Sequence, residues 1–160
     1  VALRDGGTRE LAADTIVLNT GARPAPPKLP GLDGVPYLDS TSVQELGAVP
    51  EHLLVLGGGY IGLEFGQLFR RLGAAVTIVQ HGPRLLGRED PDIADAVAAI
   101  LREDGITVLL DSQATGVRGS AGAIELAVTT PDGERALRGS HLLVAAGGPP
   151  SRGAGGGAPG

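Results

Sequence analysis

The chain has 160 residues, of which 42% are hydrophobic and 19% charged, as expected of a globular protein with one sizeable core. Its net charge of -5 argues against nucleic acid or an anionic membrane as a partner. It contains no Cys, which excludes disulfides, thiolate catalysis and zinc sites built on cysteine.

The sequence also bears on where the protein acts. No apolar run approaches the roughly 20 residues that a membrane helix needs, and no secretory signal is visible. We therefore expect a soluble, cytoplasmic protein. Because the chain opens at Val1 and contains no Met, we interpret it as an internal part of a longer protein.

The first part of the chain consists of short extended segments and turns. Residues 1–3 and 9–12 flank the polar turn DGG at 5–7, which predicts a hairpin because glycine readily adopts a positive φ. Residues 15–19 are predicted to form a short apolar strand. The prolines of residues 24–36 then predict a stiff connector and a boundary between structural units.

Strands and helices alternate through the rest of the chain. The predicted order is a helix at 40–46, a strand at 53–56, a helix at 61–72, a strand at 75–79, a helix at 91–104 and a strand at 106–110. Three segments that alternate polar and apolar residues follow over 114–137, and 141–145 is again fully apolar. This order predicts an α/β fold, a Rossmann-type domain whose parallel sheet carries an antiparallel β-meander.

Local signals define the ends of two of these helices. Ser40 or Thr41 is expected to cap the first helix. Asp90 and Pro91 are expected to be the N-cap and first residue of the last helix, which ends at Gly105. The core-facing side of that last helix is predicted to consist of Ile93, Val97, Ile100 and Leu101.

The candidate site is the stretch GGGYIG, between a predicted strand and a predicted helix. Gly57, Gly59 and Gly62 match G-x-G-x-x-G, with Gly58 and Ile61 completing the turn. In this motif the first glycine permits a tight turn, the second lets the backbone approach a pyrophosphate, and the third lets helix and strand pack closely. The helix N-terminus adds free N–H groups and partial positive charge. The alternative is an α/β turn that uses glycine for packing alone.

The residue after the strand at 75–79 distinguishes the two nicotinamide dinucleotides. A carboxylate there accepts hydrogen bonds from ribose hydroxyls and repels a 2′-phosphate. Here the residue is Gln80, followed by His81, with Arg84 and Arg88 close behind. The absence of an acid mildly favours NADPH over NADH. For the two arginines, a solvated loop is the alternative to phosphate binding.

Other polar residues near the motif are less specific. Glu64 lies in the apolar run IGLEF, where it is either exposed to solvent or paired with a cation or a ligand. Gly66 is expected to be a close-packing contact. The histidines His52, His81 and His141 are expected to be ordinary surface or strand-end residues. We predict no catalytic residue and no metal site.

Three stretches carry a family resemblance: TIVLNTGARP at 15–24, GGGYIGLEFGQLFRRLGAAVTIV at 57–79 and HLLVAAG at 141–147. Through them the chain resembles the pyridine nucleotide-disulfide oxidoreductases, the flavoenzyme family of dihydrolipoamide dehydrogenase, glutathione reductase and mercuric reductase. Residues 84–110 resemble the mercuric-reductase-like branch and its reactive-chlorine-resistance relatives. The three stretches appear in the family's order.

The resemblance implies roles for individual residues. Tyr60 would cover the flavin face until nicotinamide displaces it. Glu64 would contact the nicotinamide carboxamide or pair with a lysine of the flavin domain. The glycines of the turn would hold the pyrophosphate of NAD(P)H. The other implied contacts are Thr20 and Gly21 near FAD, Val117 at the adenine and Gly147 at the nicotinamide.

The family also has parts that these residues lack: a glycine fingerprint for FAD, a C-x4-C pair, and an interface domain with a His-Glu pair. We therefore interpret the chain as the NAD(P)H-binding middle of a homodimeric, FAD-dependent enzyme, inactive without the remainder of that flavoenzyme. Residues 1–38 would be a flavin-domain segment and connector, 39–147 the NAD(P)H-binding domain, and 148–160 a disordered tail that suggests a frameshift. The alternative is a stand-alone dinucleotide-binding regulatory module.

Overall fold

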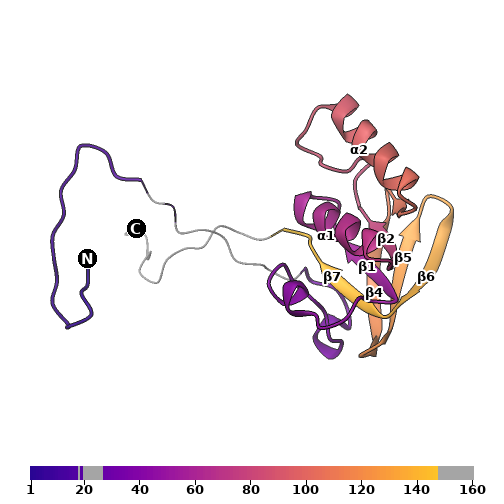
Figure 1. Cartoon of the computed structure of the whole chain (residues 1–160), viewed down its shortest axis with the longest axis horizontal. Helices are drawn as coiled ribbons and strands as arrows, with labels where there is room; N and C mark the ends of the chain where they lie inside the picture. The colour runs from indigo at the N-terminus through magenta and orange to yellow at the C-terminus, as the bar shows by residue number, and fades with distance from the viewer. Residues whose placement is uncertain (18, 20–26, 148–160) are drawn as a thin grey trace. The chain divides into compact units, whose positions relative to one another are not determined.

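A computed structural model of the chain describes residues 1–17, 19 and 27–147. The chain divides into two compact units: the smaller contains Val1–Arg23 and the larger spans Pro24–Pro149. The larger unit holds both sheets and both α-helices (Figure 1). The predicted division at residue 38 stays a prediction.

The smaller unit contains the predicted hairpin but no strand at the predicted position. Ala2 and Thr8 form an antiparallel bridge, closed by a hydrogen bond from the Leu3 N–H to the Gly7 carbonyl at 2.7 Å. At the described positions 15–17 and 19, the backbone forms no strand, and Ile16 is exposed. The strand prediction is wrong there, because a strand requires a neighbour to complete its hydrogen bonds.

The centre of the larger unit is a four-stranded parallel sheet in the order β3-β2-β1-β7. Leu53 and Val55 pack on the helix side, while Leu54 packs on the opposite side. Both faces are buried, which explains why the strands are apolar almost throughout. The bounds are β1 His52–Leu56, β2 Ala75–Val79, β3 Thr107–Leu109 and β7 His141–Val144.

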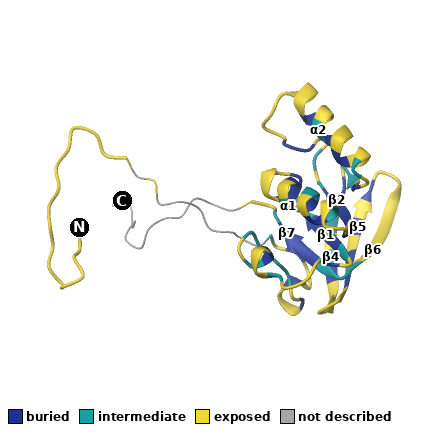
Figure 2. Ribbon diagram, in the orientation of Figure 1, coloured by how far each residue is buried: buried dark blue, intermediate teal, exposed yellow. Residues whose placement is uncertain are grey.

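Each face of the sheet has its own cover (Figure 1). Helices α1 (Tyr60–Arg71) and α2 (Pro91–Glu103) contribute to the core on one face. An antiparallel sheet in the order β4-β5-β6 packs on the other face. Buried residues concentrate between these layers (Figure 2). The predicted α/β fold with an added meander is therefore confirmed; the meander strands are β4 Gln113–Ser120, β5 Ala123–Thr130 and β6 Gly133–Gly139.

Helix α2 differs from the prediction in the side that it buries. It begins as expected, with Asp90 at the N-cap. However, Ile93 and Ile100 are 50% and 51% exposed. The prediction holds for Leu101, which is buried, and for Val97, which is partly buried against the same core. In place of the two isoleucines the helix buries Ala94 and Ala98, whose small side chains let it approach the sheet closely.

The described part of the proline-rich connector belongs to the larger unit and packs onto its core. Its short 3-10 helix η1 (Leu32–Gly34) contributes a buried Leu32, and Leu38 pairs with Leu143 of β7. The next 3-10 helix, η2 (Ser42–Glu45), occupies part of the predicted first helix.

Thr41, one of the two expected caps, is the N-cap residue of η2, but its side chain makes no capping hydrogen bond, and the side-chain acceptor is Asp39. The Asp39 carboxylate accepts hydrogen bonds from the backbone N–H groups of Ser42 at 2.8 Å and Thr41 at 2.9 Å. These bonds, that of Ser42 first, lower the pKa of Asp39. The sequence signal was misread because any of three consecutive polar residues could have supplied this acceptor.

Neither α1 nor α2, nor any other helix in the described part of the chain, has the length and apolar character needed to cross a membrane.

Candidate functional site

The glycine turn lies at the carboxyl edge of the parallel sheet, where the residues after β1, β2 and β7 meet. The Gly57 N–H donates to the Val79 carbonyl at 2.9 Å, and the Ala145 N–H donates to the Leu56 carbonyl at 2.8 Å. Parallel α/β sheets bind ligands outside this edge. The structure thus brings together three segments that are far apart in the sequence.

Two glycines of the turn are required by packing. Gly57 has φ 115°, and a Cβ there would lie 2.6 Å from the carbonyl oxygen of Ala145. A Cβ at Gly62 would lie 2.3 Å from the carbonyl oxygen of Gly57 and 3.1 Å from Val55 Cγ1. The shortest contact of each is with a backbone carbonyl oxygen, which cannot rotate away as a side chain can. Helix α1 therefore reaches β1 this closely only because these residues have no side chain.

Gly59 is different, because packing does not require it. Its backbone is extended, with φ -87° and ψ 178°, a conformation open to any residue. A Cβ built there meets no heavy atom of the described residues within 4 Å. Gly59 is exposed, and so are the next residues, Tyr60 and Ile61. Since α1 begins at Tyr60, the N–H groups of its first turn lack intrahelical acceptors.

The loop after β2 is attached to the turn through Gly58. The Gly58 N–H donates to Gln80 Oε1 at 2.9 Å, and the Leu86 N–H donates to the Gly58 carbonyl at 2.9 Å. Gly58 itself is buried, and a Cβ there would lie 2.6 Å from Leu85 Cδ2. The Gln80 side chain therefore helps to hold the turn, a role that the sequence did not suggest.

Tyr60 makes a second contact with the same loop. Its hydroxyl donates to Glu89 Oε1 at 2.5 Å, and the Tyr60 residue is 57% exposed. This hydrogen bond is the main reason why the pKa of Tyr60 is raised. Glu89 was not among the predicted residues; the signal for it was an acid that precedes the cap of α2 in the run RED.

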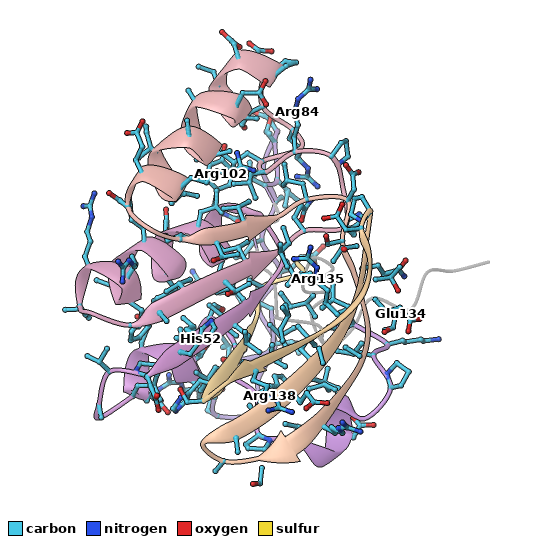
Figure 3. The ribbon with its side chains drawn as sticks, turned by 90° about the vertical axis from the view of Figure 1, so that its right-hand side faces the viewer. His52, Arg84, Arg102, Glu134, Arg135 and Arg138 are labelled. Carbon is cyan, nitrogen blue, oxygen red and sulfur yellow. The ribbon has the colours of Figure 1, made fainter. Side chains whose placement is uncertain are left out.

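The cationic side chains that follow β2 are exposed. His81, Arg84 and Arg88 all face solvent. Arg84 Nε lies 3.5 Å from Asp95 Oδ1 of α2. Figure 3 shows Arg84 near α2 and far from His52, which begins β1. Because an exposed ion pair contributes only about 0 to 1 kcal/mol, the pair with Asp95 leaves Arg84 free to bind another anion.

The remaining predicted residues lie in varied settings. Glu64 is exposed, which is one of the two settings that the sequence left open. Val117 is only 6% exposed and packs in the core between the two sheets, so its side chain is not presented to a ligand. Gly147 is exposed with φ 87°. Thr20 and Gly21 lie outside the described residues.

The histidines match their expected ordinary roles. His52 lies at the start of β1 and its Nε2 is 3.0 Å from Thr77 Oγ1. Burial lowers the pKa of His52, opposed by the nearby Glu51. His141 Nδ1 lies 3.0 Å from Ser140 Oγ. Within the described ranges, no three His, Cys, Asp or Glu residues are grouped so that they could hold a metal ion.

A cavity of about 400 Å³ lies away from the glycine turn. It opens at the start of β1, beside the turn between β4 and β5, and its polar lining includes His52, Glu125, Arg138 and Ser140. Glu125 pairs with Arg118 and with Arg138, which lower the pKa of the Glu125 carboxyl. Glu125 is thus shared by two arginines, and this cluster lies near the start of β1 and not at its carboxyl end.

Comparison with known proteins identifies relatives of the whole chain. The family described as pyridine nucleotide-disulphide oxidoreductase matches residues 1–156. A mercuric reductase of Streptomyces lividans is 48% identical over 147 residues, which are 92% of this chain and 31% of the relative. The probable pyridine nucleotide-disulfide oxidoreductase RclA of Escherichia coli is 43% identical over 110 residues, covering 68% of this chain and 25% of the relative.

A solved structure of a flavoprotein disulfide reductase is also similar to this chain. The HOCl-induced flavoprotein disulfide reductase RclA from Escherichia coli superposes with a TM-score of 0.71 at 37% identity, over 83% of this chain and 30% of that one. The chain therefore spans less than a third of the length of these relatives.

Proposed function

The chain belongs to the pyridine nucleotide-disulphide oxidoreductase family, whose members use FAD and a nicotinamide cofactor, and on this premise we propose that it binds NAD(P)H at the glycine turn. In the longer enzyme, NAD(P)H would supply a hydride and FAD would accept it. The relatives named mercuric reductase favour a mercuric-reductase-like parent.

The observation that carries this proposal is the unfilled space at Gly59. Gly57 and Gly62 are explained by the chain's own packing, whereas a side chain at Gly59 would touch nothing in the described part of the molecule. A glycine that packing does not require is explained by a ligand, because without a side chain at that position the ligand can come close to the protein backbone. The neighbouring N–H groups of α1 and the positive end of its dipole suit a pyrophosphate.

The orientation of Gln80 supports NADPH over NADH. Gly58 presents an N–H group, so the Gln80 side chain must turn its oxygen, and not its nitrogen, toward the turn. The amide nitrogen lies on the side of Gly82, where it offers a hydrogen-bond donor. A donor, with the exposed Arg84 and Arg88 nearby in the sequence, suits a 2′-phosphate better than it suits a pair of ribose hydroxyls.

Further features of the parent enzyme follow as proposals from the resemblance. Tyr60 would cover the flavin, and the exposed Glu64 would meet the nicotinamide or the flavin domain. Thr20 and Gly21 would lie near FAD, with Gly147 beside the nicotinamide. For Val117, we propose only a backbone contact with the adenine, because its side chain is buried. We also propose that the parent is a cytoplasmic homodimer.

Calorimetric titration of the 160-residue chain with NADPH and NADH tests the proposal. We expect saturable binding that Gly59→Ala weakens by at least about tenfold, because a Cβ would occupy the space of the pyrophosphate. Gly47→Ala is the matched control, since Gly47 is also exposed with nothing within 4 Å among the described residues, and it should bind as the unsubstituted chain does. If neither nucleotide binds the unsubstituted chain, the proposal is wrong.

A further inference from the structure

The segment of residues 80–90, here called the 80–90 loop, is joined to the glycine turn at three points. Two of them use the backbone of Gly58, which bonds to the Gln80 side chain and to the Leu86 N–H. The third is the hydrogen bond from the Tyr60 hydroxyl to the Glu89 carboxylate. Only this third contact joins two side chains, so it can be removed without disturbing the backbone of either segment.

The interior of the 80–90 loop is held by burial and by an unusual backbone conformation. Leu85 and Leu86 are both buried in the core on the helix side. Leu86 has φ 47°, a left-handed conformation that costs a non-glycine residue about 1 kcal/mol or more. The Glu89 N–H donates to the Leu86 carbonyl at 2.8 Å. Glu89 thus contacts the strained residue through its backbone and α1 through its side chain.

The exposed cations of the 80–90 loop lie between these attachment points. Arg84 precedes the two buried leucines, and Arg88 lies directly before Glu89. Glu89 is itself an anion and would repel a phosphate, so a direct contact with the nucleotide's phosphates is unfavourable. Its contribution to an anion site must therefore be indirect, through the position that it gives to its neighbour.

We propose that Glu89 is a positioning residue for nucleotide specificity: by bonding to Tyr60, it fixes the 80–90 loop so that Arg88 and Arg84 are available to the 2′-phosphate of NADPH. This inference rests on the proposed function. It assigns to Tyr60 a second task, which is to connect the N-terminus of α1 with the loop. Loss of the contact should therefore affect NADPH, which carries the 2′-phosphate, and leave NADH nearly unaffected.

A double-mutant cycle on the 160-residue chain tests the proposal. We expect Glu89→Ala to raise the Kd for NADPH about fivefold with less than twofold change for NADH, and Tyr60→Phe to lower the ratio of NADPH to NADH affinity by a similar factor. The double variant should be no weaker than either single one, because each substitution removes the same hydrogen bond. Glu89→Gln keeps an acceptor oxygen and should restore most of the NADPH affinity. Glu134→Ala, which removes an exposed acid from β6, is the control and should change neither Kd.

A spectroscopic measurement tests the contact without any nucleotide. The chain has two Tyr and no Trp, so Tyr37→Phe leaves Tyr60 as the sole phenol to titrate by ultraviolet absorbance. Adding Glu89→Ala should lower the Tyr60 pKa toward its ordinary value, because the carboxylate no longer accepts the phenolic hydrogen. An unchanged titration would overturn the proposal.

The outcomes distinguish a failure of the proposed function from a failure of the role proposed for Glu89. If the unsubstituted chain binds neither nucleotide, the proposed function fails and this inference fails with it. If it binds them but Glu89→Ala weakens both equally, or weakens neither, then only the positioning role of Glu89 is wrong.

Discussion

The inner and outer sides of the glycine turn use the same residue type for different reasons. On the inner side, Gly57 and Gly62 lie against backbone carbonyls, so any larger residue would separate α1 from β1. On the outer side, Gly59 has an ordinary extended backbone and open space beside it. The inner glycines are thus explained by the chain's own structure, whereas the outer one has no such packing role, and we propose a ligand for it.

Within one motif, the glycines that packing requires can therefore be told apart from the glycine available to a ligand. The sequence G-x-G-x-x-G treats its three glycines alike, but the space around each one differs in the folded chain. Substitutions on the two sides should therefore fail in different ways. Inner substitutions should lower stability, and outer ones should lower affinity with a smaller loss of stability.

The largest expected effect is on the inner side. Gly62→Ala should lower the free energy of unfolding by about 2 to 3 kcal/mol, because its Cβ would overlap the Gly57 carbonyl oxygen and the helix must shift. Urea denaturation followed by circular dichroism measures this change. The control is Gly66→Ala in the same helix, where the nearest atom would be Ile78 Cδ1 at an acceptable 3.4 Å.

The same urea denaturation measures the effect of a substitution on the outer side of the turn. Gly59→Ala should lower the free energy of unfolding by less than about 1 kcal/mol, because Gly59 is the N-cap of α1 and alanine caps a helix less well than glycine, whereas its Cβ meets no other atom of the described residues. If Gly59→Ala and Gly62→Ala destabilise the chain equally, the distinction between the two sides is wrong.

An intermediate effect is expected at Gln80, where the loop meets the turn. Gln80→Glu retains an acceptor for the Gly58 N–H and places a negative charge where we propose the 2′-phosphate binds. The ratio of NADPH to NADH affinity should fall about tenfold, or about 1.4 kcal/mol. Parallel titrations with the two nucleotides measure it. The same charge change at the exposed Gln113 of β4 should leave the ratio unaltered, and a constant ratio in Gln80→Glu would refute the ribose assignment.

The smallest effect is expected at the opposite edge of the sheet, at His52. Burial lowers its pKa, so in the folded state His52 binds fewer protons than in the unfolded state as the pH falls below about 6.5. Its contribution to stability should be fully present above that pH and be lost as the pH falls through the lowered value.

Urea midpoints between pH 7 and pH 5 measure this dependence. His52→Gln should flatten part of the decline, because it removes the group whose pKa is lowered by burial. An identical pH profile in His52→Gln would show that the burial of His52 carries no pH-dependent stability.

Much of the fold could be predicted because local patterns and long-range packing agree. The strand–glycine–helix–strand order, the polar-apolar alternation of the meander and the Asp90-Pro91 start of α2 each follow from backbone preferences. The errors arose where neighbouring residues offered equivalent choices. Ile93 and Ala94 start two adjacent apolar stripes on α2, and only the space beside the sheet selected the stripe with smaller side chains.

Some residues of the candidate site could likewise be predicted from the sequence, and others could not. The glycines and Gln80 could be identified from the sequence because their spacing from an apolar strand is characteristic. Glu89 could not, because its contact with Tyr60 spans 29 positions and depends on how the 80–90 loop folds back. The burial of Val117 likewise depends on the meander packing against the parallel sheet.

The sequence by itself determined the order of strands and helices and the family to which the chain belongs, because hydrophobic periodicity and glycine spacing are local properties. Only the tertiary structure decided which glycine is left without a packing role and which side chains hold the 80–90 loop. Those outcomes depend on distances between segments that the chain brings together only when its two sheets and helices share one core.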